Sequence, residues 1–155
     1  MAIKSYTGKR VKETPKEISL KVSDYMTRDL ITFRPEQSIE EVIEALIIHR
    51  VSGGPVVNED NELIGIISEG DCIKHISDSR YYNMPMEHSK VELRMIKNVE
   101  TIDGNMNIFD AAKKFLEVKR RRFPIVENGK LVGQISQKDI LKATMGLKSE
   151  HWKSM

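Results

Sequence analysis

The residues best placed to do chemistry occur in a pattern that the chain contains twice. Gly-x-Ile-Ser-x-x-Asp appears as GIISEGD at 65–71 and as GQISQKD at 133–139. A serine three residues before an acid is a variant of the capping box that begins a helix. The same side chains suit a ligand, because a carboxylate accepts hydrogen bonds from hydroxyl groups and free N–H groups at a helix start attract phosphate. The pattern alone leaves both interpretations open.

The motif belongs to a longer internal repeat. Met95 lies 69 residues after Met26, and at this offset Thr32 matches Thr101 and Pro55 matches Pro124. One residue then drops out of a turn, and at an offset of 68 the two Gly-x-Ile-Ser-x-x-Asp motifs match throughout. The gap falls where a turn tolerates it, so the alignment indicates a duplicated unit.

Each copy predicts the same order of elements. A β-prone run (30–33 or 99–102) precedes an amphipathic helix that begins after Ser38 or Asn107 and has apolar residues at helical spacing. A hairpin follows, with Asn128-Gly129 as a strong turn signal in the second copy. A second helix opens at Ser68 or Ser136. The sequence therefore predicts an α+β fold of two pseudo-symmetric β-α-β-β-α repeats, packed together because each is too small to stand alone.

This alignment divides the 155 residues into five parts. We expect an N-terminal tail at 1–20, repeat 1 at 21–78, a linker at 79–90, repeat 2 at 91–145 and a C-terminal tail at 146–155. The net charge of +2 is too balanced to indicate nucleic-acid binding, and no apolar run is long enough to span a bilayer. The N-terminus lacks the apolar region of a secretory signal and the chain has one cysteine, so we expect a cytoplasmic protein.

Other chemistry is sparse in the sequence. The four histidines lack paired ligand spacing, so we expect no metal site. Cys72 matches Ile140 in the repeat, which is typical of a small core residue. A nucleophile with a partner base and a Walker A motif are both missing from the sequence, which predicts a binding protein and not an enzyme.

The matched features resemble the tandem CBS-domain pair, also called a Bateman module. They are the opening Met, the Thr of the first strand, Pro-Val-Val or Pro-Ile-Val in the second, and Gly-x-Ile-Ser-x-x-Asp into the last helix, over residues 20–145. The resemblance is specific for the fold and less so for function, because such pairs bind different adenosine-containing ligands and some bind none detectably.

The resemblance implies a ligand in the cleft between the repeats. The Asp would bind both ribose hydroxyls, the Ser would help to hold phosphate, and the Thr region and the Pro-Val-Val strand would enclose the adenine. One expected site contains Asp71, Ser68, Thr32, Val56 and Val57. The other contains Asp139, Ser136, Thr101, Ile125 and Val126.

The two sites differ in their charges. Arg121 and Arg122 precede Pro124, where family members often place His or Arg against phosphate, and their partners Ser52 and Gly53 are uncharged. Lys138 matches Gly70. We therefore expect Arg121, Arg122 and Lys138 to reach across the cleft and support phosphate at the Asp71 site, which leaves the Asp139 site weaker.

The sequence thus favours a regulatory module that binds AMP, ADP, ATP or a related adenosyl compound as a regulatory ligand, with no required cofactor. The resemblance implies a homodimer that acts as an energy or metabolite sensor on a separate effector protein. The alternative is a ligand-free scaffold for dimerisation or interaction. A third interpretation, nucleic-acid binding through the basic tail and KRRR at 119–122, is disfavoured by the balanced charge and the few aromatic residues.

Overall fold

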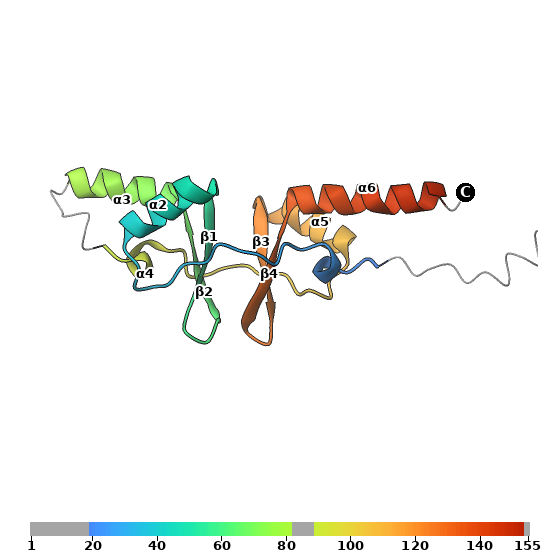
Figure 1. The fold of residues 1–155 in the computed structure, drawn as a ribbon, viewed down its shortest axis with the longest axis horizontal. Helices are drawn as coiled ribbons and strands as arrows, with labels where there is room; N and C mark the ends of the chain where they lie inside the picture. Colours follow the sequence, from blue (N-terminus) through green and yellow to red (C-terminus); the bar gives the residue numbers. More distant parts are fainter. Residues whose placement is uncertain (1–18, 82–88, 154–155) are drawn as a thin grey trace, which may run out of the picture.

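The computed structural model describes residues 19–81 and 89–153 and contains two similar halves (Figure 1). Most of the expected N-terminal tail and of the expected linker therefore lies outside the described residues. The element order is η1 (Val22–Asp24), α2 (Ile39–His49), β1 (Gly53–Val57), β2 (Leu63–Ser68), α3 (Glu69–Tyr81), α4 (Val91–Arg94), α5 (Ile108–Val118), β3 (Arg122–Glu127), β4 (Lys130–Ser136) and α6 (Gln137–Lys153). The predicted α+β class is confirmed.

The first long helix of each half, α2 or α5, begins and ends as its sequence predicts. Ser38 Oγ accepts the backbone N–H of Glu41 at 3.1 Å, and Asn107 Oδ1 accepts that of Phe109 at 2.8 Å. At their other ends Arg50 and Lys119 take left-handed backbone conformations, which turn the chain out of the helix. Sixty-nine residues apart, the two helices therefore share the same length and the same stop.

Each half contains one antiparallel hairpin, β1–β2 or β3–β4. Asn128 and Gly129 both have positive φ, as their turn signal predicts. The expected opening strands are shorter than the sequence suggests, because each makes a single parallel bridge, Phe33 to Val56 and Ile102 to Ile125. Helix α6 continues to Lys153, through most of the expected C-terminal tail.

The hydrophobic core of each half includes residues from the opening segment of the other half. Val22 and Met26 pack in the core of repeat 2, whereas Val91 packs in the core of repeat 1, with Met95 against it. In Figure 1 the N-terminal segment (blue) starts beside α5 and then crosses to α2. The expectation that neither repeat stands alone therefore has a structural basis, although the core is two exchanged cores and not one shared sheet surface.

Two glycines make this exchange possible. A Cβ at Gly133 would lie 2.6 Å from Met26 Sδ and 3.0 Å from the Thr27 carbonyl oxygen. A Cβ at Gly65 would meet Met95 Sδ at 2.6 Å and the Ile96 carbonyl oxygen at 3.0 Å. The first glycine of each repeated motif is therefore needed for packing and not for a turn.

The halves also touch at their hairpin tips. Asn61 Nδ2 donates to the Leu131 carbonyl at 2.9 Å, and Lys130 Nζ donates to the Asp60 carbonyl at 2.6 Å. Among the described residues, no helix is both long and apolar enough to cross a membrane.

The substitution Gly133→Val should lower the free energy of unfolding by about 1–3 kcal/mol, because the added side chain displaces Met26 and presses on a backbone carbonyl. Urea unfolding measures this. Gly146→Ala is the control, since no atom lies within 4 Å of its added Cβ, and a helical Gly→Ala change is neutral or stabilising by about 0.5–1 kcal/mol. Equal midpoints for Gly133→Val and wild type would contradict the exchanged packing.

Candidate functional site

The repeated Ser-x-x-Asp motifs form helix caps in both halves. Asp71 Oδ2 accepts the Ser68 backbone N–H and the Ser68 hydroxyl, both at 2.9 Å, and the Asp71 N–H points to Ser68 Oγ at 3.4 Å. In repeat 2, Ser136 and Asp139 make the same three bonds at 2.9, 2.9 and 3.1 Å. The capping interpretation is therefore correct for the free protein. Both carboxylates accept these bonds through Oδ2, and among the described residues Oδ1 has no hydrogen-bond donor.

A cavity of about 220 Å³ lies between the two halves, beside the helix start of repeat 1. Its walls come from β1 and the residue before it, from β2, from residues 120–122 where β3 begins, and from one residue of β4. They are Ser52, Gly53, Gly54, Pro55, Ile66, Ser68, Arg120, Arg121, Arg122 and Gln134. The structure thus brings Ser68 of one repeat together with Arg121 and Arg122 of the other.

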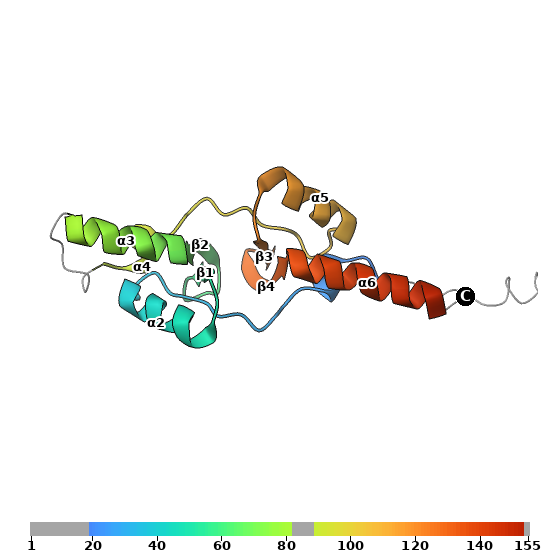
Figure 2. The same cartoon turned by 90° about the horizontal axis from the view of Figure 1, so that it is seen from above.

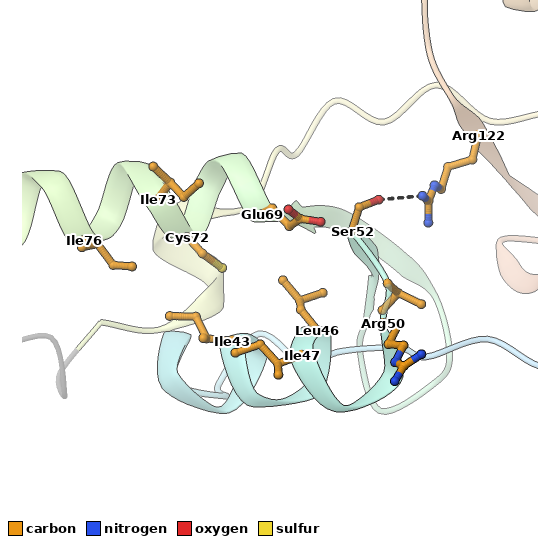
Figure 3. A pocket seen from close by; sticks show the side chains of 11 residues that line it. Ile43, Leu46, Ile47, Arg50, Ser52, Glu69, Cys72, Ile73, Ile76 and Arg122 are labelled. Atoms are coloured by element: carbon orange, nitrogen blue, oxygen red, sulfur yellow. Dashed lines mark hydrogen bonds between the residues drawn. The ribbon is translucent and has the colours of Figure 1, made fainter.

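Arg122 joins the two sides of this cleft directly. Its Nη2 donates to Ser52 Oγ at 2.7 Å, across 70 residues of sequence (Figure 3). Arg122 is half-buried, whereas Arg121 is exposed. Arg122 therefore already has a protein partner, and Arg121 is the freer of the two cations for a ligand anion.

A second cavity on the repeat 2 side is much smaller. Its volume is about 20 Å³, room for about one water molecule, and it is bordered by 98–100, Arg122 and Phe123. Where repeat 1 has Gly53 and Gly54, the repeat alignment places Arg122 and Phe123. The Phe123 ring is buried and lies 4.8 Å from the Phe115 ring, centroid to centroid. The two repeats therefore differ at these positions, because Arg122 reaches across to Ser52 and Phe123 packs in the core of repeat 2.

Gly54 lets the chain at Ile31 and Phe33 approach β1 closely. A Cβ there would lie 2.6 Å from the Ile31 carbonyl oxygen and 3.0 Å from the Phe33 ring. The backbone before Thr32 thus approaches β1 closely, and a larger residue at this position would push the two apart.

The remaining expected site residues lie at varied depths. Val56, Val57 and Ile125 are buried, the first and last of them in the two cores, so they can only offer backbone to a ligand. Val126 is half-buried. None of these four lines the 220 Å³ cavity, although Pro55 beside Val56 does.

The polar candidates Asp71, Ser136 and Asp139 also lie outside that cavity's lining, and so do Thr32, Thr101 and Lys138. Thr32 is exposed, and Thr101 is half-buried with its carbonyl accepting Lys114 Nζ at 3.1 Å. Lys138 is exposed on the first turn of α6. The structure thus brings Arg121 and Arg122 to the Ser68 side of the cleft, and Lys138 only to the neighbouring helix start.

Several lining residues were missed by the sequence reasoning, namely Ser52, Gly53, Gly54, Pro55, Ile66, Arg120 and Gln134. The repeat alignment held a signal for some of them, because it set Ser52 and Gly53 opposite Arg121 and Arg122. Nothing in the sequence marked Gln134, which lies opposite Ile66, as a lining residue.

Cys72 is 3% exposed, as expected of a core residue. Burial, together with the carboxylates of Asp71 and Glu69, raises the pKa of its thiol above the ordinary value. It therefore stays protonated and a poor nucleophile at neutral pH. Within 19–81 and 89–153, no group of three or more His, Cys, Asp or Glu side chains is arranged to hold a metal ion.

The model of the CBS domain family matches the chain twice, at residues 22–78 and 90–146. The chloroplastic CBS domain-containing protein CBSX1 of Arabidopsis thaliana is 30% identical over 153 residues, covering 82% of this chain and 65% of that protein. The uncharacterized protein MK0525 of Methanopyrus kandleri is 34% identical over 126 residues, covering 80% of this chain and 62% of that protein. The chain thus spans less than two thirds of these curated relatives.

Solved structures with the same fold include proteins with bound ligands. CBSX2 from Arabidopsis thaliana, solved in complex with AMP, has a TM-score of 0.74 and 28% identity, covering 84% of this chain and 99% of that one. The CBS domain pair of MJ0100, solved with 5′-methylthioadenosine and S-adenosyl-L-methionine, has a TM-score of 0.66 and 27% identity, covering 81% of this chain and 96% of that one.

Removing either motif carboxylate should destabilise the ligand-free protein. Asp71→Ala and Asp139→Ala each lose an acceptor for two hydrogen bonds at a helix start, so the free energy of unfolding should fall by about 0.5–2 kcal/mol. Urea unfolding measures the loss, with Asp60→Ala in the exposed β1–β2 loop as the control. Losses no larger than that of the control would show that the caps contribute nothing.

Proposed function

Because this chain belongs to the CBS domain family and contains a tandem pair of its domains, we propose that it is a regulatory module for an adenosine-containing ligand such as AMP, ADP or ATP. The observation that carries the proposal is the 220 Å³ cavity, where a helix start of repeat 1 faces arginines of repeat 2. The related pairs solved with AMP and with S-adenosyl-L-methionine support the ligand class.

Each part of such a ligand has a chemically suitable partner. The free carboxylate oxygen of Asp71 would accept from ribose hydroxyls, and charge-assisted bonds of this kind contribute about 1.5–3 kcal/mol each. Ser68 and the N–H groups at the start of α3 would hold phosphate, with Arg121 beside them. The backbone around Thr32 and along β1 at Val56 and Val57 would enclose the purine.

The second proposed site uses Asp139, Ser136, Thr101 and the β3 strand at Ile125 and Val126. We propose that it binds more weakly, because Ser52 and Gly53 stand where the first site has arginines.

A ligand in the cleft contacts both repeats, so it can favour one relative arrangement of the halves over another. The shift is limited by the difference in its affinity for the two arrangements. In this proposal the change is passed to a separate effector protein, and the module acts as a homodimer. The alternative function, a scaffold without ligand, is supported by the exposed apolar side chains of the helices, such as Ile47 and Leu116.

Calorimetric titration with AMP, ADP, ATP and S-adenosyl-L-methionine tests the proposal. A ligand at 100 times its Kd should stabilise the protein by about 2.7 kcal/mol, which raises the Tm by about 5–10 °C. Asp71→Ala should weaken binding about 30- to 150-fold because the ribose loses its acceptor, while Asp60→Ala keeps the affinity. No heat and no Tm shift with any of the four compounds would favour the scaffold.

Replacing the cationic side chains tests whether the two sites differ in their affinity for phosphate. Arg121→Ala together with Lys138→Ala should weaken AMP binding about tenfold or more and leave adenosine binding nearly unchanged, because only the phosphate loses a partner. Arg121→Ala alone should account for most of the loss, since Arg121 lines the cavity and Lys138 does not. Lys142→Ala, one turn further along α6, is the control. Unchanged AMP affinity in the double variant would refute this assignment.

A further inference from the structure

Side-chain hydrogen bonds join the two halves at both ends of their hairpins. At the tips, Asn61 and Lys130 donate to carbonyl oxygens of the other half. At the opposite end, where β1 and β3 begin, Arg122 Nη2 donates to Ser52 Oγ at 2.7 Å. Figure 2, seen from the side of the helices, shows the two hairpins next to each other between the helices of repeat 1 and those of repeat 2. The Arg122–Ser52 bond thus joins the halves at the end of the cleft that lies nearest the helices.

Both partners of this bond line the cavity of about 220 Å³. Cavities that hold small molecules in proteins usually measure about 300–1,000 Å³, so the ligand-free cleft is smaller than usual and has a hydrogen bond across it. Ser52 is also connected to the helix start of the proposed site, because its carbonyl accepts the Glu69 N–H at 2.9 Å. A change at Ser52 can therefore reach the first turn of α3, where phosphate is proposed to bind.

The repeat alignment shows that the Arg122–Ser52 bond belongs to one side of the cleft. The counterparts of Ser52 and Arg122 are Arg121 and Gly53. Gly53 lacks a side chain, so it cannot donate the matching bond. The Arg121 carbonyl nevertheless accepts the Gln137 N–H at 3.2 Å, which corresponds to the bond between Ser52 and Glu69. The two copies therefore share the backbone arrangement and differ in the side-chain contact.

A ligand phosphate would compete with Ser52 for the guanidinium group. Arginine can bind phosphate through two parallel charge-assisted hydrogen bonds, which are stronger than one bond to a neutral hydroxyl. We propose that the Arg122–Ser52 bond is a clasp that holds the ligand-free cleft closed, and that a ligand phosphate opens it by taking the guanidinium from Ser52. Ser52 then lowers the affinity for phosphorylated ligands, because the clasp must break when they bind. Adenosine has no phosphate and leaves the clasp closed.

This inference rests on the proposed function and adds that Arg122 exchanges partners when the ligand binds. Calorimetric titration of Ser52→Ala should show AMP binding about 3- to 10-fold tighter than to wild type, because no bond to Ser52 has to be broken. Adenosine affinity should stay unchanged. In an Arg122→Ala background, Ser52→Ala should have no effect on AMP binding. Ser23→Ala, the same change at a half-buried serine outside the cavity lining, is the control and should keep both affinities.

An unchanged or weaker AMP affinity in Ser52→Ala would overturn the clasp, and weaker binding would show that Ser52 instead positions Arg122 for phosphate. In both cases wild type still binds AMP, so the proposed function survives. If wild type binds none of AMP, ADP and ATP, the proposed function and the clasp fail together.

Distances between two spin labels measure the arrangement of the halves directly. Glu44→Cys and Lys113→Cys place the labels at matched, exposed positions of α2 and α5, while Cys72 is buried and can remain. An excess of unlabelled chain keeps label pairs from different copies rare. AMP should shift the distance distribution of this labelled chain, and Ser52→Ala should produce part of the same shift without ligand. Identical distributions with and without Ser52→Ala in the ligand-free protein would show that the bond does not hold the cleft closed.

Discussion

The rest of the structure depends on the exchange of opening segments between the halves. Met26 packs on Gly133 and Met95 packs on Gly65, each within a core that belongs to the other half of the chain. A glycine at these two positions is therefore a packing requirement, since a Cβ would meet both a sulfur atom and a backbone carbonyl. Neither half can bury its own core without the other, which is why two units of this size form one stable module.

The exchange also places the cleft. Because each half is tied to the other by backbone bonds such as Thr27 to Gln134 and Ile96 to Ile66, the two hairpins stand side by side and touch at their tips. The space between them is lined by residues from both halves, with Arg122 bound to Ser52 across it. A molecule in this cleft would contact both halves at once, which is the physical condition for a ligand to change how they sit together.

Duplication followed by divergence explains the inequality of the two halves. Both copies keep the Ser-x-x-Asp cap with nearly identical hydrogen bonds, because the cap stabilises a helix whether or not a ligand binds. The copies differ at Gly53-Gly54 against Arg122-Phe123, and Arg122 reaches across the cleft to Ser52. They differ again at Glu44 against Lys113, on the helical surface. The features that the two copies share are those that folding requires, whereas the positions at which they differ lie on the cleft and on the helical surface.

Much of this was determined by the sequence alone. The repeat, the boundaries of α2 and α5, the Asn128-Gly129 turn and the motif at each second helix follow from apolar periodicity, caps and turn residues, which act within a few residues along the chain. Only the tertiary structure decided that Val22 and Val91 belong to the opposite cores, that the expected opening strands make one bridge each, and that Ser52, Gly54 and Gln134 line the cleft while Val56 and Ile125 face the cores. These outcomes depend on contacts between residues from 23 to 84 positions apart. Local patterns specify which face of an element is apolar, but packing selects the element that covers it.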